Sequence, residues 1–190
     1  YFDVTPEVAK YVYGHWQKKG TLPFPTEENV LKYHQALRNQ PGEVEVLHSF
    51  GITDEIIDSL QLGFDDCRII IPVKSRTGHI VNLRKYLPPH RRTAEGKNAK
   101  CINIRNLGSK RYFPYEAFDQ ETVVVVEGEK DCLAARSQGI NAVTSTGGSS
   151  IPTDELILFK DKHVILMLDN DNVGKRNVKN YMMMLQTTEM

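Results

Sequence analysis

Two short apolar runs in the second half of the chain form its most regular pattern. Val123–Val126 is an unbroken run of β-branched residues, and His163–Leu168 is a second apolar run further along the chain. Short continuous runs of this kind predict buried parallel strands, because a sheet covered on both faces has no polar side. Each run ends in acidic residues with a glycine nearby. Since parallel strands end at one edge of a sheet, where α/β proteins bind ligands, the pattern predicts an acidic site there.

The rest of the chain alternates between helical and extended patterns. Helices are predicted from Thr5, from Thr26, over residues 43–50, after Thr53, after Asp131, from Pro152 and after Gly174. The last helix is expected to turn Val178, Tyr181, Met182 and Leu185 inward. Further strands are predicted at Arg68–Val73, His79–Tyr86, Lys100–Ile104 and Ala142–Ser145. The first two form a hairpin, in which Pro72 restricts its strand to an edge or a bulge.

Composition narrows the class of protein. The chain has 190 residues, 40% of them hydrophobic, which is enough for one large or two small cores. It contains no apolar run long enough for a membrane span and no secretory leader, so a cytoplasmic protein without a membrane partner is expected. Its 3 cysteines have no short pairing, which argues against a disulfide framework and a zinc knuckle.

The net charge of zero hides an uneven distribution. Nine basic residues and one acid, Glu95, lie between Arg84 and Arg111. The basic residues are Arg84, Lys85, Arg91, Arg92, Lys97, Lys100, Arg105, Lys110 and Arg111. A solvated charged loop would mix the two signs, whereas a basic segment beside an acidic site suits a polyanion held near a metal ion. A nucleic-acid-binding surface is therefore predicted here.

The acidic residues after the two strands predict a metal site. Glu127, Asp169 and Asp171 would repel one another at a shared edge unless a hard cation were bound, and Mg²⁺ prefers such carboxylate oxygens. The alternative is that these acids cap the helices that follow. For Glu129 alone, capping and metal binding are equally well supported. Gly147 and Gly148 lie in a glycine-rich turn whose backbone N–H groups offer a phosphate site or form an ordinary loop.

These motifs together resemble a known family. Residues 127–131 (Glu-Gly-Glu-Lys-Asp), then 141–148 (Asn-Ala-Val-Thr-Ser-Thr-Gly-Gly), then 168–174 (Leu-Asp-Asn-Asp-Asn-Val-Gly) are similar to a TOPRIM domain. The likeness is greatest to primases of the bacterial replicative and phage primase-helicase type. It implies an α/β fold with a Rossmann-like, mostly parallel sheet. The parts expected are a helical segment (1–64), a basic α+β subdomain with a β-hairpin (65–118) and a C-terminally incomplete TOPRIM domain (119–190).

The resemblance also implies an activity and its residues. A DNA primase joins nucleoside triphosphates into an RNA primer on a single-stranded DNA template, with Mg²⁺ or Mn²⁺, and works with a replicative helicase. Asp169 and Asp171 are expected as metal ligands, Glu127 as a ligand or general acid/base and Asp131 in support. The residues expected to hold nucleic acid or nucleotide are Arg84, Lys85, Lys100, Lys110, Arg111, Gly147 and Gly148.

The sequence departs from the family in one respect that keeps alternatives open. TOPRIM primases carry a third acidic motif after the Asp-x-Asp segment, and this sequence offers only Glu189 there. The chain is therefore expected to be the middle of a longer primase or primase-helicase. A TOPRIM nuclease or topoisomerase would share the acids but cleave DNA. A non-catalytic module of a helicase would bind single-stranded DNA without using them.

Overall fold

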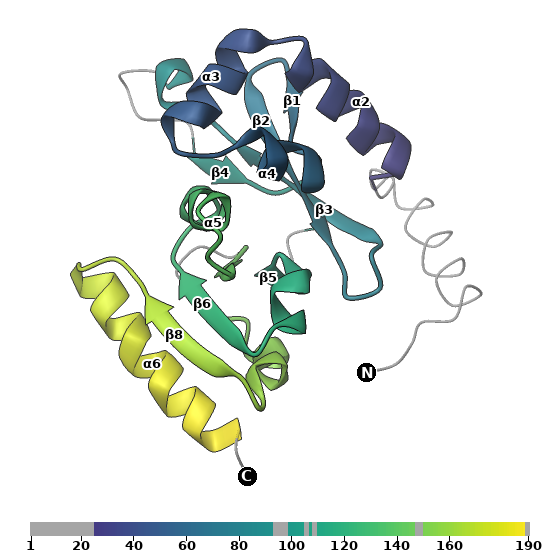
Figure 1. Cartoon of the computed structure of the whole chain (residues 1–190). Coiled ribbons are helices and arrows are strands. Elements are labelled where there is room, and N and C mark those ends of the chain that lie inside the picture. Colours follow the sequence, from purple (N-terminus) through teal and green to yellow (C-terminus); the bar gives the residue numbers. More distant parts are fainter. Residues whose placement is uncertain (1–24, 93–98, 105–106, 108–109, 147–149, 189–190) are drawn as a thin grey trace.

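The computed structural model describes residues 25–92, 99–104, 107, 110–146 and 150–188, which form two lobes (Figure 1). The helix predicted from Thr5 lies outside these residues. Helices α2 (Glu27–Arg38), α3 (Pro41–Ser49) and α4 (Asp54–Ser59) belong to the first lobe. They accompany an antiparallel sheet in the order β1 (Gly63–Asp65), β2 (Arg68–Lys74), β3 (Ile80–Tyr86) and β4 (Cys101–Ile102). A 3₁₀ turn, η1 (Pro89–Arg91), follows β3.

The second lobe is built on a mostly parallel sheet with the order β5-β7-β6-β8. The strands are β5 (Tyr112–Phe113), β6 (Thr122–Val126), β7 (Ala142–Ser145) and β8 (His163–Met167), and β5 alone runs antiparallel. Its helices are η2 (Tyr115–Asp119), α5 (Glu129–Ser137), η3 (Thr153–Phe159) and α6 (Asn172–Thr188). The predicted α/β class with a helical segment, a hairpin lobe and a mostly parallel sheet is confirmed.

Local sequence signals explain where α2 begins. The Thr26 hydroxyl accepts the Asn29 backbone N–H, and the Asn29 side chain accepts the Thr26 N–H in return. This reciprocal cap satisfies two of the donors that a helix start leaves free. The helix ends at Arg38, just before the Pro41 that starts α3. The predicted helix from Thr26 is thus confirmed.

Strand β1 was not predicted, because three residues are too few to show a periodic pattern. It forms where the chain passes very close to α2: a Cβ on Gly63 would lie 2.5 Å from the Cβ of Tyr33. Only glycine permits that approach. Gly63 then pairs with Ile70 of β2 and starts the sheet.

Pro72 sits in β2, an inner strand, at a point where one side of the strand is open. Pairing with β1 reaches only from Arg68 to Ile70, whereas Pro72 lies opposite Leu83 of β3. Beyond the short β1 the strand is locally an edge, so the missing N–H of proline leaves no ladder bond unmade. The predicted hairpin of β2 and β3 is confirmed, and Pro72 lies where β2 is paired on one side only, as predicted for an edge position.

The two faces of the second sheet are covered by different helices. On one face Val123, Val125 and Val143 pack with Phe159 of η3 and Tyr181 of α6. The opposite face is covered by α5, whose Cys132 packs with Val124, Val126 and Ala142. The valine run of β6 is therefore buried on both sides, as predicted.

Strand β8 departs from the same prediction. It is the edge strand, and α5 covers only the β6 and β7 part of its face. As a result Ile165 is 42% exposed and Met167 50% exposed. The prediction for α6 was also wrong at one residue, since Met182 is 54% exposed while Tyr181 is buried.

One hydrophobic cluster joins the two lobes. Phe113 of β5 and Leu133 of α5, both in the second lobe, pack in the same core as Leu47, Ile52 and Tyr86 of the first. Figure 1 shows α5 lying between the two sheets. The two lobes therefore share part of one hydrophobic core.

Within the described residues, no helix combines the length and the apolar character that crossing a bilayer requires.

Candidate active site

Glu127 and Asp169 meet at the carboxyl ends of two neighbouring parallel strands. Val126, the last residue of β6, lies beside Met167, the last residue of β8. Glu127 directly follows the first strand, and its Oε2 accepts the backbone N–H of Asp169 at 3.2 Å. Asp169 is exposed and Glu127 is half-buried. The Glu127 carboxylate therefore lies beside the backbone of Asp169 at this edge of the sheet.

Asp171 occupies a different position, as the cap of α6. Its Oδ1 accepts the backbone N–H groups of Val173 and Gly174, both at 2.8 Å. This is the capping role that was the alternative to metal binding, with the charge near the positive end of the helix. Its second oxygen, Oδ2, makes no hydrogen bond within the described residues. The cap therefore leaves one carboxylate oxygen of Asp171 for other contacts.

Gly174 is required by the way α6 approaches β8. A Cβ at this position would lie 1.9 Å from the carbonyl oxygen of Asp169, far inside contact distance. The first turn of α6 thus packs directly against the backbone of Asp169. This contact sets where both Asp169 and Asp171 stand relative to β6.

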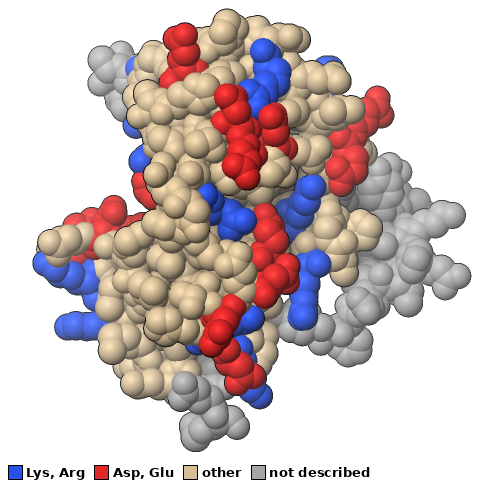
Figure 2. Space-filling model, viewed as in Figure 1, with Lys and Arg blue, Asp and Glu red and all other residues tan. Residues whose placement is uncertain are grey.

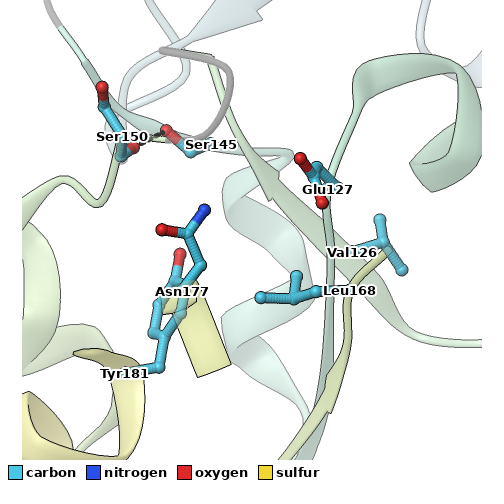
Figure 3. Close-up of a pocket in the computed structure, with 7 residues that line it drawn as sticks. All are labelled: Val126, Glu127, Ser145, Ser150, Leu168, Asn177 and Tyr181. Carbon is cyan, nitrogen blue, oxygen red and sulfur yellow. Dashed lines mark hydrogen bonds between the residues drawn. The ribbon is translucent and has the colours of Figure 1, made fainter. Parts of the chain in front are cut away.

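A small pocket opens beside Glu127. Figure 3 shows the Asn177 amide of α6 pointing into the space between Ser145 and Glu127, with Tyr181 below it. Asn177 is 6% exposed, and burial raises the pKa of the Tyr181 hydroxyl, which lies 3.2 Å from the Tyr112 hydroxyl. Neutral polar groups therefore line the inner side of Glu127. Asn177 was not singled out from the sequence, because nothing in a helix pattern marks which polar residue faces a pocket.

The first turn of α5 carries the other two acids of the Glu-Gly-Glu-Lys-Asp motif. Asp131 pairs with its neighbour, Lys130, at 2.6 Å and is half exposed. Glu129 is 7% exposed and pairs with Arg84 of β3 in the first lobe. The sequence had left the role of Glu129 open, and its partner lies 45 residues away, so no local signal could identify it.

Several residues of the predicted basic surface are paired with acids from other parts of the chain. Lys85 pairs with Asp65, and Arg91 pairs with Glu43 at 2.6 Å. Arg111 lies 3.6 Å from Glu155. In the view of Figure 2, Lys and Arg side chains accordingly alternate with Asp and Glu over the hollow between the lobes. The uneven charge along the sequence is thus largely balanced in space.

Three of the predicted basic residues have no ion pair with a described residue. Arg92 donates instead to the Leu87 carbonyl and the Tyr86 hydroxyl, which leaves Lys100 and Lys110. Lys100 and Lys110 are exposed, and the structure gives their ammonium groups no ion pair with any described residue. They flank β4 and β5, on the segment that joins the lobes. Among the described residues they are the candidates of that segment best placed for contacts with an anion.

The predicted phosphate turn at Gly147 and Gly148 lies outside the described residues. Its flanks are fixed: Ser145 donates its hydroxyl to the Ser150 carbonyl at 2.6 Å, and the Thr146 N–H donates to the Arg111 carbonyl at 2.8 Å. Ser145 and Ser150 both line the pocket that contains Glu127.

The carboxylate oxygens of Glu127 and Asp169 are of the kind that a hard divalent cation prefers. Their arrangement limits the number of protein ligands. In the part of the chain that the structure describes, no three His, Cys, Asp or Glu side chains come together as a metal-binding group. Mg²⁺, however, is usually held by one or two carboxylates, with water and substrate phosphates completing its shell. Glu127 and the exposed Asp169 fit such an open site.

Comparison with known proteins agrees with the fold and the order of the motifs. Residues 124–190 match a family described as Toprim-like. The DNA primase of Borreliella burgdorferi is 30% identical over 166 residues, which cover 82% of this chain and 30% of that protein. The chain thus spans about a third or less of the curated relatives that it matches.

Solved structures give the same result for the fold. The Aquifex aeolicus primase, with its zinc-binding and RNA polymerase domains, has a TM-score of 0.67 at 17% identity, covering 96% of this chain and 59% of that one. A DnaG primase catalytic domain bound to single-stranded DNA has a TM-score of 0.65 at 21% identity, covering 81% and 62%. At these identities the likeness establishes the fold.

The fold and the acidic edge define a TOPRIM protein, in which a mostly parallel sheet follows a helical and antiparallel lobe. Within that class, the chain is similar in sequence to bacterial DNA primases and in fold to the catalytic core of DnaG-type primases.

Proposed function

We propose that this chain is the catalytic part of a DNA primase and joins ribonucleotides on a single-stranded DNA template. The observation that carries the proposal is the contact between Glu127 and Asp169 at the end of β6 and β8. It lies within a fold like that of primase catalytic domains. Nucleotidyl transfer needs the attacking hydroxyl polarised and the pyrophosphate charge neutralised. Divalent ions held by carboxylates at such an edge would do both.

The cofactor in this proposal is Mg²⁺ or Mn²⁺, held by Asp169, with Glu127 beside it as a further ligand or as the general acid/base. Asp171 contributes its Oδ2, since only Oδ1 is used in capping α6. A divalent ion bound there supplies charge neutralisation for the triphosphate. Glu127 is half-buried beside the neutral groups of the pocket and is the candidate general acid/base. Asp131 supports the site from α5 without a direct contact to Glu127 in the described structure.

The substrates follow from the exposed cations. Lys100 and Lys110 are assigned to the template or the triphosphate, since exposed ammonium groups without a protein partner make the phosphate contacts that position nucleic acid. Lys85 and Arg111 are already paired with acids and take secondary roles. Gly147 and Gly148 are assigned to a phosphate, because glycine-rich turns offer backbone N–H groups to anions and the flanking Ser145 and Ser150 line the pocket with Glu127. A replicative helicase, in the same or another chain, is the partner that primer synthesis implies.

A ribonucleotide incorporation assay tests this function. The chain is incubated with single-stranded DNA, labelled nucleoside triphosphates and Mn²⁺, and products are checked for complementarity to the template. We expect template-dependent products that Asp169→Asn removes. The matched control is Asp161→Asn, at the opposite end of β8, where the residue has φ 59° and asparagine tolerates the conformation.

Two other outcomes would replace the proposal. Cleavage of the DNA without incorporation would assign the acids to a nuclease or topoisomerase. Tight binding of single-stranded DNA with neither reaction, and with no effect of Asp169→Asn, would assign the chain to a non-catalytic binding module.

A further inference from the structure

We propose that Arg84 and Glu129 are positioning residues, whose buried ion pair fixes the first turn of α5 and through it the place of Glu127. The inference rests on the proposed function, because it takes Glu127 as a catalytic carboxylate. It gives Arg84 a role different from the nucleic-acid contact that the sequence predicts.

The pair is buried between the lobes. Arg84 Nε lies 2.5 Å from Glu129 Oε1, and the two side chains are 7% and 9% exposed. Breaking a buried charge pair by removing one partner is strongly destabilising, because the remaining charge is left uncompensated. The two residues therefore have to be considered as one unit.

A polar network on the first lobe holds the guanidinium in place. Arg84 Nη1 donates to Asn103 Oδ1 at 2.9 Å, and the same oxygen accepts from Asn82 Nδ2 at 2.7 Å. Asn82 in turn accepts the Ile104 backbone N–H at 3.3 Å. Since β3 and the segment after β4 supply these groups, the cation belongs to a rigid part of the sheet.

The carboxylate of the pair is tied to the candidate active site through a very short stretch of backbone. Glu129 is the first residue of α5, and only Gly128 separates it from Glu127. The first turn is closed by the Cys132 N–H, which donates to the Gly128 carbonyl at 2.9 Å. A displacement of Glu129 would therefore move the backbone that carries Glu127.

Other contacts hold the rest of α5 to the first lobe. The Lys130 ammonium lies 5.8 Å from the Phe50 ring centroid, and Ser137 Oγ accepts the Thr53 backbone N–H at 3.0 Å. Leu133 is buried in the core that both lobes share. Several contacts along α5 thus attach this helix to the first lobe. Of these contacts, the ion pair between Arg84 and Glu129 is the one nearest to Glu127 in the sequence.

A direct role of Arg84 in binding phosphate conflicts with this arrangement. Arg84 is 6% exposed, and a phosphate at its guanidinium would have to displace the Glu129 carboxylate. That carboxylate would then stay buried beside the phosphate, with two like charges in contact. Lys100 and Lys110, which are exposed, offer phosphate contacts without that cost.

The test uses a pair of apolar replacements of similar length in the complete chain. Arg84→Met and Glu129→Met are compared singly and together, because replacing both members of a buried pair by apolar residues is often neutral. Amide hydrogen exchange at Cys132 and Leu133 reports the first turn of α5, and kcat and KM for nucleoside triphosphates report the reaction. Glu129→Gln, which keeps the shape and a hydrogen-bond acceptor, covers the case in which Glu129→Met does not fold.

We expect each single replacement to speed exchange at these amides by roughly 100-fold or more, as for a broken buried pair. The double replacement should bring exchange back to within about tenfold of the original rate, with Glu129→Gln intermediate. In the reaction, kcat should fall in the single variants and recover in the double, while KM stays unchanged. As a control, Arg38→Met breaks an exposed ion pair on the same lobe and should leave exchange in α5 unaltered.

The inference would be overturned by unchanged exchange in Arg84→Met, or by a double variant no better than the singles. A KM that rises equally in Arg84→Met and in the double variant would return Arg84 to a direct contact with substrate. If the unmodified chain incorporates no ribonucleotide, the proposed function fails, and the exchange measurement still decides whether the pair holds α5.

Discussion

At the scale of single residues, the site is defined by how each acid is engaged. Glu127 accepts the Asp169 N–H, Asp171 caps α6 and Glu129 pairs with Arg84. Three acids from the two sequence motifs therefore have three different environments. Sequence spacing places them near one sheet edge, but the environment of each depends on contacts between distant segments.

The first prediction concerns proton transfer by Glu127. Glu127→Gln keeps the side-chain volume but removes the charge and the capacity to accept a proton. If Glu127 is the general base, the rate should fall by about 10²–10⁴-fold while Mn²⁺ is still bound. Steady-state rates and Mn²⁺ titrations check this. Loss of the metal together with the rate would make Glu127 a ligand instead.

The second prediction concerns Gly174. In Gly174→Ala the new Cβ would lie 1.9 Å from the Asp169 carbonyl oxygen, so the first turn of α6 must move away from β8. Overpacking of this kind costs about 1–3 kcal/mol, which thermal unfolding would detect. The matched control is Gly42→Ala, whose Cβ would meet nothing within 4 Å in α3. It should be neutral or stabilising, and equal losses in both variants would contradict the account.

At the scale of elements, the sequence predicted the strands of the site well and their surroundings less well. The strand at Ala142–Ser145 was predicted with the observed bounds, because turn residues frame a short apolar run. Strand β1 was missed because its formation depends on the contact between Gly63 and Tyr33. The exposure of Ile165 in β8 was missed because an apolar run does not show whether a helix covers it.

The basic segment illustrates a second limit of sequence reasoning. A count of charges along the chain predicted a continuous surface, yet Arg84, Lys85 and Arg91 pair with Glu129, Asp65 and Glu43. Ion pairs between segments far apart in sequence leave no local trace. The predicted surface is thereby reduced, among the described residues, chiefly to Lys100 and Lys110.

The third prediction tests whether Lys100, and not the paired Lys85, contacts DNA. Affinity for single-stranded DNA should fall with salt, and Lys100→Ala should lower the slope of log affinity against log salt by about 0.7, the value for one phosphate contact. Lys85→Ala is the control, since Lys85 already pairs with Asp65 and should change the slope little. Fluorescence anisotropy over a range of salt concentrations measures both. A larger effect of Lys85→Ala would show that the ion pair opens when DNA binds.

At the scale of the whole molecule, the two lobes share one core. Leu133 and Phe113 of the second lobe pack with Leu47 and Tyr86 of the first. The order of segments in the sequence predicted three parts, but not that α5 would pack in a core shared by both lobes. That helix has one face toward the sheet and another toward the first lobe, and its nine residues are too few for the pattern to separate these faces.

The fourth prediction follows from this shared core. Leu133→Ala removes a side chain that is 1% exposed and should cost about 2–5 kcal/mol, the range for a large-to-small change in a core. Because both lobes contribute to the cluster, unfolding followed by Trp or Tyr fluorescence and by circular dichroism should remain one transition at a lower temperature. Leu31→Ala, at a residue 49% exposed, is the control. Separate transitions in the unmodified chain would show that the lobes unfold independently.

The proposed function requires a divalent ion at the carboxyl ends of β6 and β8. The most direct measurement is a Mn²⁺ titration of the chain by electron paramagnetic resonance or calorimetry, compared with Asp169→Ala. We expect the unmodified chain to bind at least one ion and Asp169→Ala to lose it, because Asp169 is exposed and its backbone N–H binds the Glu127 carboxylate. Asp161→Asn should bind as the unmodified chain does. Unchanged Mn²⁺ affinity in Asp169→Ala would contradict the assignment of this edge as the metal site.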